Sequence, residues 1–344
     1  MPMQSPLSKL HNLQHYEELL SMDHSACAAD SAVMKVIKHC EEEGAGNMEV
    51  AQGVLLGLVV DSVLEITNCF PFPRHLDDNM DEEDYQLEMM RNLRKVNIDH
   101  LHVGWYQSTQ MANFLSPQLL ESQFSYQTSI EESVVLIYDP VKTARGFLSI
   151  RAYRLTPEAV KLYKEDDFSP EAVKNLRLPY SRLLQEIPIV IRNSTLVNLL
   201  LLELQKKKGP VKVCESQFMD LGTTSVLERH LRCLMDCVDD LSQEMNKFNI
   251  YQRQLVKHQQ TKHTYMQKRT LENEARQMRG EPPLPEEDVN KMFKSLPPPP
   301  RRETLIASGQ VENYCQQIST FASQALGKLF LAEALQCGKS QSSI

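Results

Sequence analysis

The sequence predicts an α/β domain with a mixed sheet flanked by helices, followed by a mainly helical C-terminal region. Short apolar runs alternate with helical patterns between about residues 30 and 155, which is typical of an α/β core. From about residue 156 the apolar residues recur mainly at helical spacing. A chain of 344 residues with 42% hydrophobic content is long enough to bury such a core beside a helical appendage.

The N-terminal half supplies the first strands and helices. Ser31 can cap a helix that ends near Gly44, because serine favours helix starts and glycine favours helix ends. Residues 53–60 and 63–69 are apolar runs of strand length, and the prolines after Phe70 should end the second strand. The next helix places four side chains on one stripe, namely Tyr85, Met89, Leu93 and Val96.

Three further strands and one helix complete the predicted core. Residues 101–106, 134–139 and 147–155 are expected as strands, and residues 117–126 as a helix that begins with proline. Pro188 should start an apolar helix that reaches Lys208. Its leucine-rich stretch is too short to span a membrane, so we expect it to be buried by partner helices.

Two apolar stripes in the C-terminal region predict packing between helices. The first is a heptad seam with spacings of four and three, made of Leu227, Leu231, Leu234, Val238, Leu241, Met245 and Phe248. The second lies on the last helix and contains Val311, Tyr314, Ile318 and Phe321. Such stripes require a partner helix to cover them, so we expect these residues to form a subunit interface.

Charge and composition narrow the possible functions. The net charge of -8 argues against attraction of the whole chain to nucleic acid or to anionic membrane. The eight cysteines form no CxxC pair and the first 30 residues hold no long apolar run, so we expect a cytoplasmic protein with reduced thiols. Residues 251–279 carry seven Lys or Arg against two Glu. This stretch could contact RNA or an acidic partner, or simply be a solvated helix.

Three segments resemble the MPN (Mov34/Pad1 N-terminal) domain: residues 49–57, residues 103–106 with the sequence Val-Gly-Trp-Tyr, and residues 134–140. The resemblance implies an MPN (JAMM-like) fold over residues 31–170. Catalytic members are zinc isopeptidases whose motif runs Gly-Trp-Tyr-His-x-His-Pro and then Ser-x-x-Asp, with a glutamate upstream. The histidines and the aspartate hold zinc, which lowers the pKa of its bound water to about 7.

Every zinc-site position of that motif is changed in this sequence. The two histidines fall on Gln107 and Thr109. If Ser116 is the motif serine, the aspartate falls on Leu119, and the upstream glutamate falls on Val50. None of these side chains is a good zinc ligand. The resemblance therefore implies a non-catalytic member with no metal and no other cofactor.

A second histidine pair lies nearby but has no third ligand. His100 and His102 would share one face of a strand. However, no Asp or Glu occurs between Leu101 and Leu120, and the pair precedes the Gly-Trp-Tyr sequence instead of following it. We therefore expect these histidines to serve in packing or partner contact.

A finer resemblance, carried by residues 97–109, 131–140 and 280–288, is to the MPN subunits of eukaryotic translation initiation factor 3. It implies a non-enzymatic scaffold that pairs with the MPN domain of the f subunit and joins a bundle of C-terminal helices. Through the complex, such a subunit would support assembly on the small (40S) ribosomal subunit. Two alternatives remain open: an MPN subunit of a proteasome-lid or signalosome complex, and an atypical deubiquitinating isopeptidase.

The expected organisation has six segments. They are a variable arm at 1–30, the MPN domain at 31–170, a helical region with the heptad seam and basic extension at 171–279, a proline-rich linker at 280–302, an assembly helix at 303–337 and a tail at 338–344.

Overall fold

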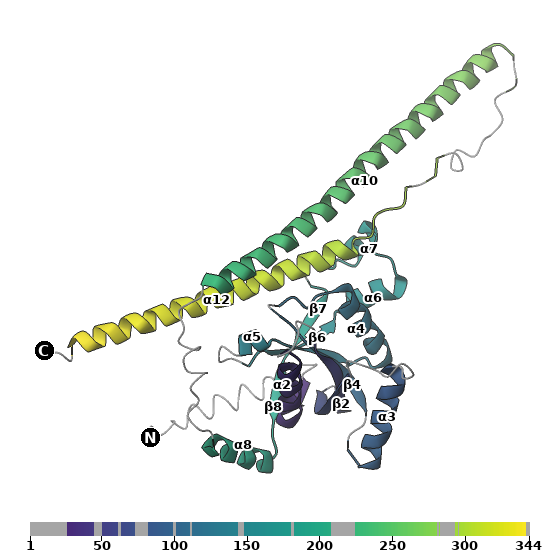
Figure 1. Ribbon diagram of the computed structural model, residues 1–344. Coiled ribbons are helices and arrows are strands. Elements are labelled where there is room, and N and C mark those ends of the chain that lie inside the picture. Colours follow the sequence, from purple (N-terminus) through teal and green to yellow (C-terminus); the bar gives the residue numbers. More distant parts are fainter. Residues whose placement is uncertain are drawn as a thin grey trace.

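The computed structural model (Figure 1) describes most of the chain. The described residues are 26–44, 50–60, 63–72, 82–98, 101–110, 112–143, 148–179, 182–207, 224–280, 282, 293–294 and 296–341. The expectations for residues 1–25, for His100, for most of the proline-rich linker and for the last three residues of the tail lie outside this part.

One mixed sheet of eight strands organises the N-terminal domain, in the order β7-β6-β5-β4-β2-β3-β1-β8. The strands are β1 Ala26–Ala29, β2 Gln52–Val60, β3 Val63–Pro71, β4 His102–Ser108, β5 Val134–Tyr138, β6 Ile150–Leu155, β7 Leu184–Ile187 and β8 Ile189–Arg192. β4 pairs with β5 in parallel, and β1 is parallel to both β3 and β8. The other pairs are antiparallel, so the predicted mixed sheet is confirmed.

Helices cover both faces of this sheet. They are α2 Asp30–Gly44, α3 Glu82–Lys95, α4 Pro117–Ser129, α5 Pro140–Thr143, α6 Pro157–Glu165, α7 Pro170–Asn175, α8 Thr195–Lys207, α10 Thr224–Met278 and α12 Arg302–Gln341. Val33 and Val36 of α2 pack in one core cluster with Tyr106. The cluster on the other face joins Trp105 to α4, α6 and the start of α12. Trp105 and Tyr106 belong to different clusters because adjacent strand residues point to opposite faces.

Local sequence explains where several helices begin. Ser116, Thr156 and Ser169 cap α4, α6 and α7, and each is followed by a proline in the first helical turn. Each cap oxygen accepts a hydrogen bond from a backbone N–H that the first turn would otherwise leave unpaired. Proline fits there because its missing N–H would have no helical partner.

The sheet extends beyond the expected boundaries of 31–170. β1 lies in the expected arm, yet Ala26 and Ala28 are fully buried between β3 and β8. β7 and β8 lie in the region expected to be helical. The helix expected from Pro188 begins only at Thr195, and its leucines are exposed instead of buried. The sheet domain therefore spans residues 26–192.

Two smaller expectations are also wrong. β3 does not end before the prolines but runs through Pro71, which pairs with Gly53 as the last residue of the strand. Val96 does not join the stripe of α3, because the helix ends at Lys95 and the Val96 side chain is exposed. Tyr85, Met89 and Leu93 do share one face of α3, and this face packs on β2 and β3.

Two long helices form the C-terminal region and run antiparallel to each other (Figure 1). The His230 ring lies 6.2 Å from that of Phe321, and the Arg301 guanidinium lies 4.2 Å from the centre of the Phe248 ring. α12 starts in the core of the sheet domain and then follows the first half of α10. None of the helices within the described residues combines the length and apolarity needed to cross a bilayer.

Candidate functional site

The strand β4 holds the Gly-Trp-Tyr sequence at the centre of the sheet, between β2 and β5. The Trp105 indole N–H donates to Gln123 Oε1 at 3.0 Å, and Gln123 Nε2 donates to the Ser133 carbonyl at 3.0 Å. On the opposite face, the Tyr106 hydroxyl lies 3.0 Å from His39 Nδ1. Burial raises the pKa of Tyr106, so its hydroxyl stays protonated at neutral pH. These bonds fix both rings as parts of the core.

Gln107 and Thr109, which align with the two histidines of the catalytic motif, are both buried at the end of β4. Gln107 is 7% exposed, and its Oε1 accepts a bond from Gln52 Nε2 at 3.2 Å. Thr109 is 4% exposed, and its N–H donates to the Tyr138 carbonyl at 2.8 Å. Between them, Ser108 Oγ accepts a bond from the Ala51 N–H at 2.8 Å. The end of β4 is therefore tied to both neighbouring strands.

The other two motif positions lie in unlike places. Leu119 is 2% exposed and packs in the core cluster around Trp105. Val50 is 49% exposed and lies just before β2. An amide, a hydroxyl and two aliphatic side chains do not make a zinc site. Among the described residues, no group of three or more His, Cys, Asp or Glu side chains is placed to hold a metal ion.

His102 has a packing role. Its Nε2 lies 2.8 Å from the Gly104 carbonyl oxygen, and its ring meets the Tyr126 ring edge-on at 4.8 Å. Burial lowers the pKa of His102, although the bond to Gly104 partly opposes this shift. The neutral ring is thus favoured, in line with the expectation of packing.

The start of α12 holds the loop that follows the former motif. Gln310 is buried, its Oε1 accepts from the Leu115 N–H at 3.3 Å, and its Nε2 donates to the Ala112 carbonyl at 2.7 Å. Arg302 bonds Glu121 of α4 at 2.5 Å. These contacts were not predicted from the sequence. The sequence does not single these residues out, because the first half of α12 contains many other polar side chains.

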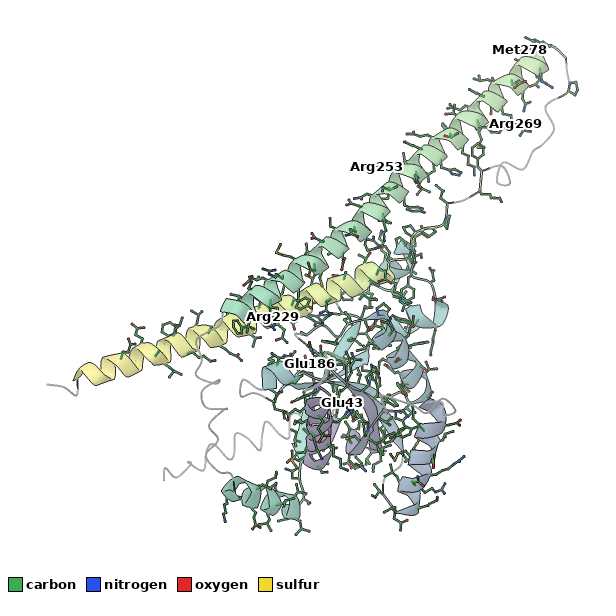
Figure 2. All side chains as sticks on the ribbon, in the orientation of Figure 1. Glu43, Glu186, Arg229, Arg253, Arg269 and Met278 are labelled. Carbon is green, nitrogen blue, oxygen red and sulfur yellow. The ribbon has the colours of Figure 1, made fainter. Side chains whose placement is uncertain are left out.

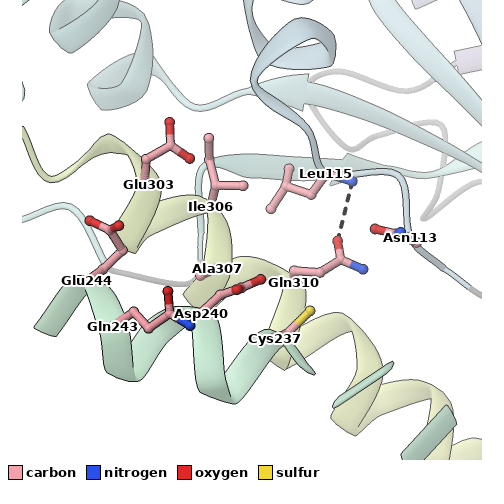
Figure 3. Close-up of a pocket in the computed structure, with 10 residues that line it drawn as sticks. All are labelled: Asn113, Leu115, Cys237, Asp240, Gln243, Glu244, Glu303, Ile306, Ala307 and Gln310. Atoms are coloured by element: carbon pink, nitrogen blue, oxygen red, sulfur yellow. Dashed lines mark hydrogen bonds between the residues drawn. The ribbon is translucent and has the colours of Figure 1, made fainter. Parts of the chain in front are cut away.

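We call the hydrogen bonds of Gln310 to the loop the latch. Beside the latch lies a small cavity of about 330 Å³ (Figure 3). The loop contributes Asn113 and Leu115, while Cys237, Asp240 and Glu244 of α10 and Glu303 of α12 line the other sides. The lining is mixed in polarity, and Gln310, which also faces it, already bonds the loop. The cavity marks the junction of the sheet domain with both long helices.

The predicted seam on α10 is divided between a covered and an exposed side. Leu227, Leu234, Leu241 and Phe248 repeat every seven residues and are half-buried on the side where Phe248 meets Arg301. Leu231, Val238 and Met245, the other seam positions, are exposed, as is Met235 beside them. On α12, Tyr314 is buried, whereas Val311, Ile318 and Phe321 are half-buried. The two predicted stripes thus partly cover each other, a contact within the chain that their spacing alone did not predict.

Comparison with known proteins identifies the family. The family model for the C-terminal region of eIF3h matches residues 143–341, and the model of the JAB1/Mov34/MPN/PAD-1 ubiquitin protease matches residues 28–132. The H subunit of eukaryotic translation initiation factor 3 from Bombyx mori is 60% identical over 308 residues, which are 90% of each chain. The chain belongs to the eIF3h family.

Other members of the eIF3h family match equally broadly. The protein of the same name from Aedes aegypti is 58% identical over 90% of this chain and 91% of its own length. The H-B form from Danio rerio is 58% identical over 88% of this chain and 91% of its own length. These matches confirm the predicted resemblance to the MPN subunits of the initiation factor, and favour it over the proteasome-lid and signalosome alternatives.

Proposed function

We propose that this member of the eIF3h family is a non-enzymatic scaffold subunit of eukaryotic translation initiation factor 3. In this proposal it pairs through its MPN domain with the f subunit and through its C-terminal helices with a helical bundle. It thereby supports assembly of the initiation complex on the 40S ribosomal subunit in the cytoplasm. One observation carries the proposal. The heptad position of Leu234 and Leu241 on α10 is covered by α12, whereas the position of Leu231 and Val238 is exposed.

The chemistry of the motif positions supports a role without catalysis. A zinc isopeptidase needs ligands that hold the metal and a base that takes a proton from its bound water. Gln107 is hydrogen-bonded through its side chain, Thr109 is buried and held by its backbone N–H, and Leu119 is packed in the core. No carboxylate or imidazole stands at any of the four positions.

The exposed half of the seam favours a bundle with helices of other subunits. Leu231, Met235, Val238 and Met245 recur at helical spacing and lie along one side of α10. A second exposed group, Leu326, Leu329, Phe330 and Leu331, lies on α12 where this helix runs past the start of α10 (Figure 1). Burying each such side chain contributes about 1.5–3 kcal/mol before ordering costs are subtracted.

Helix α8 is the surface that we assign to MPN pairing. Five of its leucines are exposed, namely Leu196, Leu199, Leu200, Leu202 and Leu204, and Leu196 reaches 78%. The helix follows β8, the edge strand of the sheet, and lies far from the long helices in Figure 1. A contiguous apolar surface of this kind is typical of a protein interface. The α8 surface is thus available to the f subunit while the long helices contact others.

Affinity purification of the tagged chain from cell extract, followed by mass spectrometry, tests the proposal. The variant Leu231→Asp with Val238→Asp should lose most other initiation factor subunits, because it places two charges in the bundle. The control Arg229→Asp with Gln254→Asp puts the same number of aspartates on another side of α10, where both wild-type residues are exposed, and should copurify normally. Normal copurification of both variants would refute the bundle.

The same preparation tests the absence of catalysis. Atomic absorption should find no stoichiometric zinc in the purified chain, and chelation should not change any residual isopeptidase activity. Bound zinc together with activity that is lost on chelation would overturn the scaffold proposal in favour of an atypical enzyme.

A further inference from the structure

The outer half of α10 is a basic helix that projects away from the rest of the molecule. Figures 1 and 2 show α10 continuing well past the sheet domain, with Arg253, Arg269 and Met278 along the projecting part. Over residues 251–279 the helix carries seven Lys or Arg and two Glu, whereas the whole chain has a net charge of -8. Positive charge is thus concentrated on the element that extends furthest from the acidic remainder.

Four cations share one face: three lie on α10, and Arg279 directly follows the last residue of this helix, Met278. Lys257, Lys268 and Arg279 are spaced by eleven residues, which is close to three turns of 3.6 residues, and Arg253 lies one turn before Lys257. We call these four residues the basic stripe. All four are exposed, and within the described part of the chain none of them pairs with a carboxylate. At 1.5 Å per residue the basic stripe is about 39 Å long.

Among the described residues, no segment is shown in contact with the basic stripe. The returning chain touches another side of the helix, where Phe293 meets His258 at 5.7 Å and Tyr265 at 5.6 Å between ring centres. Glu272, the acidic residue nearest to this face, lies 3.7 Å from Arg276. Regularly spaced, unpaired cations on a rigid helix therefore face solvent.

We propose that the basic stripe binds the phosphate backbone of RNA. Phosphate contacts need cations at an accessible face and do not need an apolar centre. A protein interface is usually anchored by contiguous apolar or aromatic side chains. The exposed apolar residues along the basic stripe, Val256, Met266, Leu271 and Met278, are five to ten residues apart, so they form no contiguous apolar anchor. These features favour RNA over an acidic protein.

The proposal also explains why the charge is placed on a projecting helix. The remainder of the chain is acidic and repels phosphate, so a flat contact with RNA would be unfavourable. A helix that extends beyond this field can reach phosphates while the sheet domain stays away from them. The contact is independent of sequence, because it uses no base edges.

Fluorescence anisotropy with a labelled RNA duplex and the full chain tests the proposal. Four phosphate contacts should give a slope of about -3 to -4 for log K against log salt concentration. Changing all four stripe residues to Gln should lower the affinity at least about tenfold at about 50 mM salt and remove most of this slope. Glutamine has nearly the helix propensity of Lys and Arg, so circular dichroism should be unchanged.

A matched variant controls for net charge. Arg91, Arg94, Lys161 and Lys164 are exposed cations of the sheet domain, and changing them to Gln alters the charge equally. This variant should bind RNA like the wild type. Equal loss in both variants, or no binding by the wild type at about 50 mM salt, would overturn the proposal. Tighter binding of poly-glutamate than of RNA would assign the basic stripe to an acidic protein instead. Because this assay needs no other subunit, its failure would leave the scaffold proposal untouched.

Discussion

The sheet domain and the long helices differ in how completely they bury their apolar side chains. Leu55, Leu56 and Leu64 of the sheet are fully buried, and helices of the same chain cover both faces. On α10, by contrast, one of the two heptad positions of the predicted seam is exposed, and α12 exposes further apolar side chains beyond its own stripe. The core of the sheet domain is therefore filled by residues of this chain, whereas the long helices keep exposed apolar surface whose burial by another chain would be stabilising.

The junction between the sheet domain and the long helices is held by defined hydrogen bonds as well as by apolar packing. Leu305 is fully buried in the core of the sheet domain, Gln310 bonds the loop at Leu115, and Arg301 N–H donates to the Phe168 carbonyl at 2.8 Å. Helix α12 is therefore anchored at its start and exposed at its end. This arrangement gives the helical surfaces a fixed direction relative to the sheet.

The largest loss of stability should come from a charge at Leu119, compared with the same charge at Val50. Both residues align with zinc-site positions of the catalytic motif, but only Leu119 is buried. Leu119→Asp buries a carboxylate without a partner and should lower the free energy of unfolding by about 3–5 kcal/mol. Val50→Asp, at an exposed position, should change it by less than about 0.5 kcal/mol. Urea unfolding followed by the fluorescence of Trp105, the only tryptophan, measures both. Equal effects would mean that Leu119 is not in the core.

Replacing a leucine by alanine should destabilise the isolated chain more in the sheet domain than on the exposed side of α10. Leu55→Ala removes a fully buried side chain and should cost about 2–5 kcal/mol in the isolated chain. Leu231→Ala, on the exposed side of α10, should cost less than about 1 kcal/mol there. In the assembled complex the Leu231 variant should instead weaken association. A large loss of stability in the isolated chain would show that Leu231 is already covered.

The strands that could be predicted from the sequence are those whose own residues form a continuous or alternating apolar run. The run from Val134 to Tyr138 is apolar throughout because both faces of β5 are covered. The missed strand β1 has the sequence Ala-Cys-Ala-Ala, which carries no periodicity and is defined only by its distant partners β3 and β8. β8 was missed because the apolar run after Pro188 fits a strand as well as a helix.

The sequence was sufficient to predict which side-chain types occupy the candidate site, but not which distant residues contact it. Replacement of the ligand positions by Gln107, Thr109 and Leu119 is visible in the sequence and indicated a site without metal. That Gln310 would reach the loop almost 200 residues earlier is not visible, because a single polar residue on a helix does not name its partner. Likewise, the heptad spacing predicted a covering helix without revealing that α12 supplies half of the cover.

The latch between the two regions should contribute a moderate amount. Gln310→Ala removes two hydrogen bonds and leaves a buried N–H and a buried carbonyl without partners, which should cost about 1–3 kcal/mol. Gln316→Ala, on the exposed side of the same helix, should be nearly neutral. Urea unfolding and limited proteolysis near Asn113 measure the difference. Equal stability of the two variants would show that the latch does not hold the loop.

The smallest effect should be a pH dependence confined to the sheet domain. Burial lowers the pKa of His102 below its ordinary value of about 6.5, so the folded chain binds fewer protons there than the unfolded chain. Stability contributed by the neutral ring is therefore present above the unfolded pKa and is lost as the pH falls through 6.5 toward the lower folded value. His102→Gln should flatten this part of the pH profile by up to about one proton. The exposed Asn246 of α10 provides the control, since Asn246→Gln changes no titratable group and should leave the profile as it is. A wild-type profile that rises on acidification would place the charged ring, and not the neutral one, in the folded state.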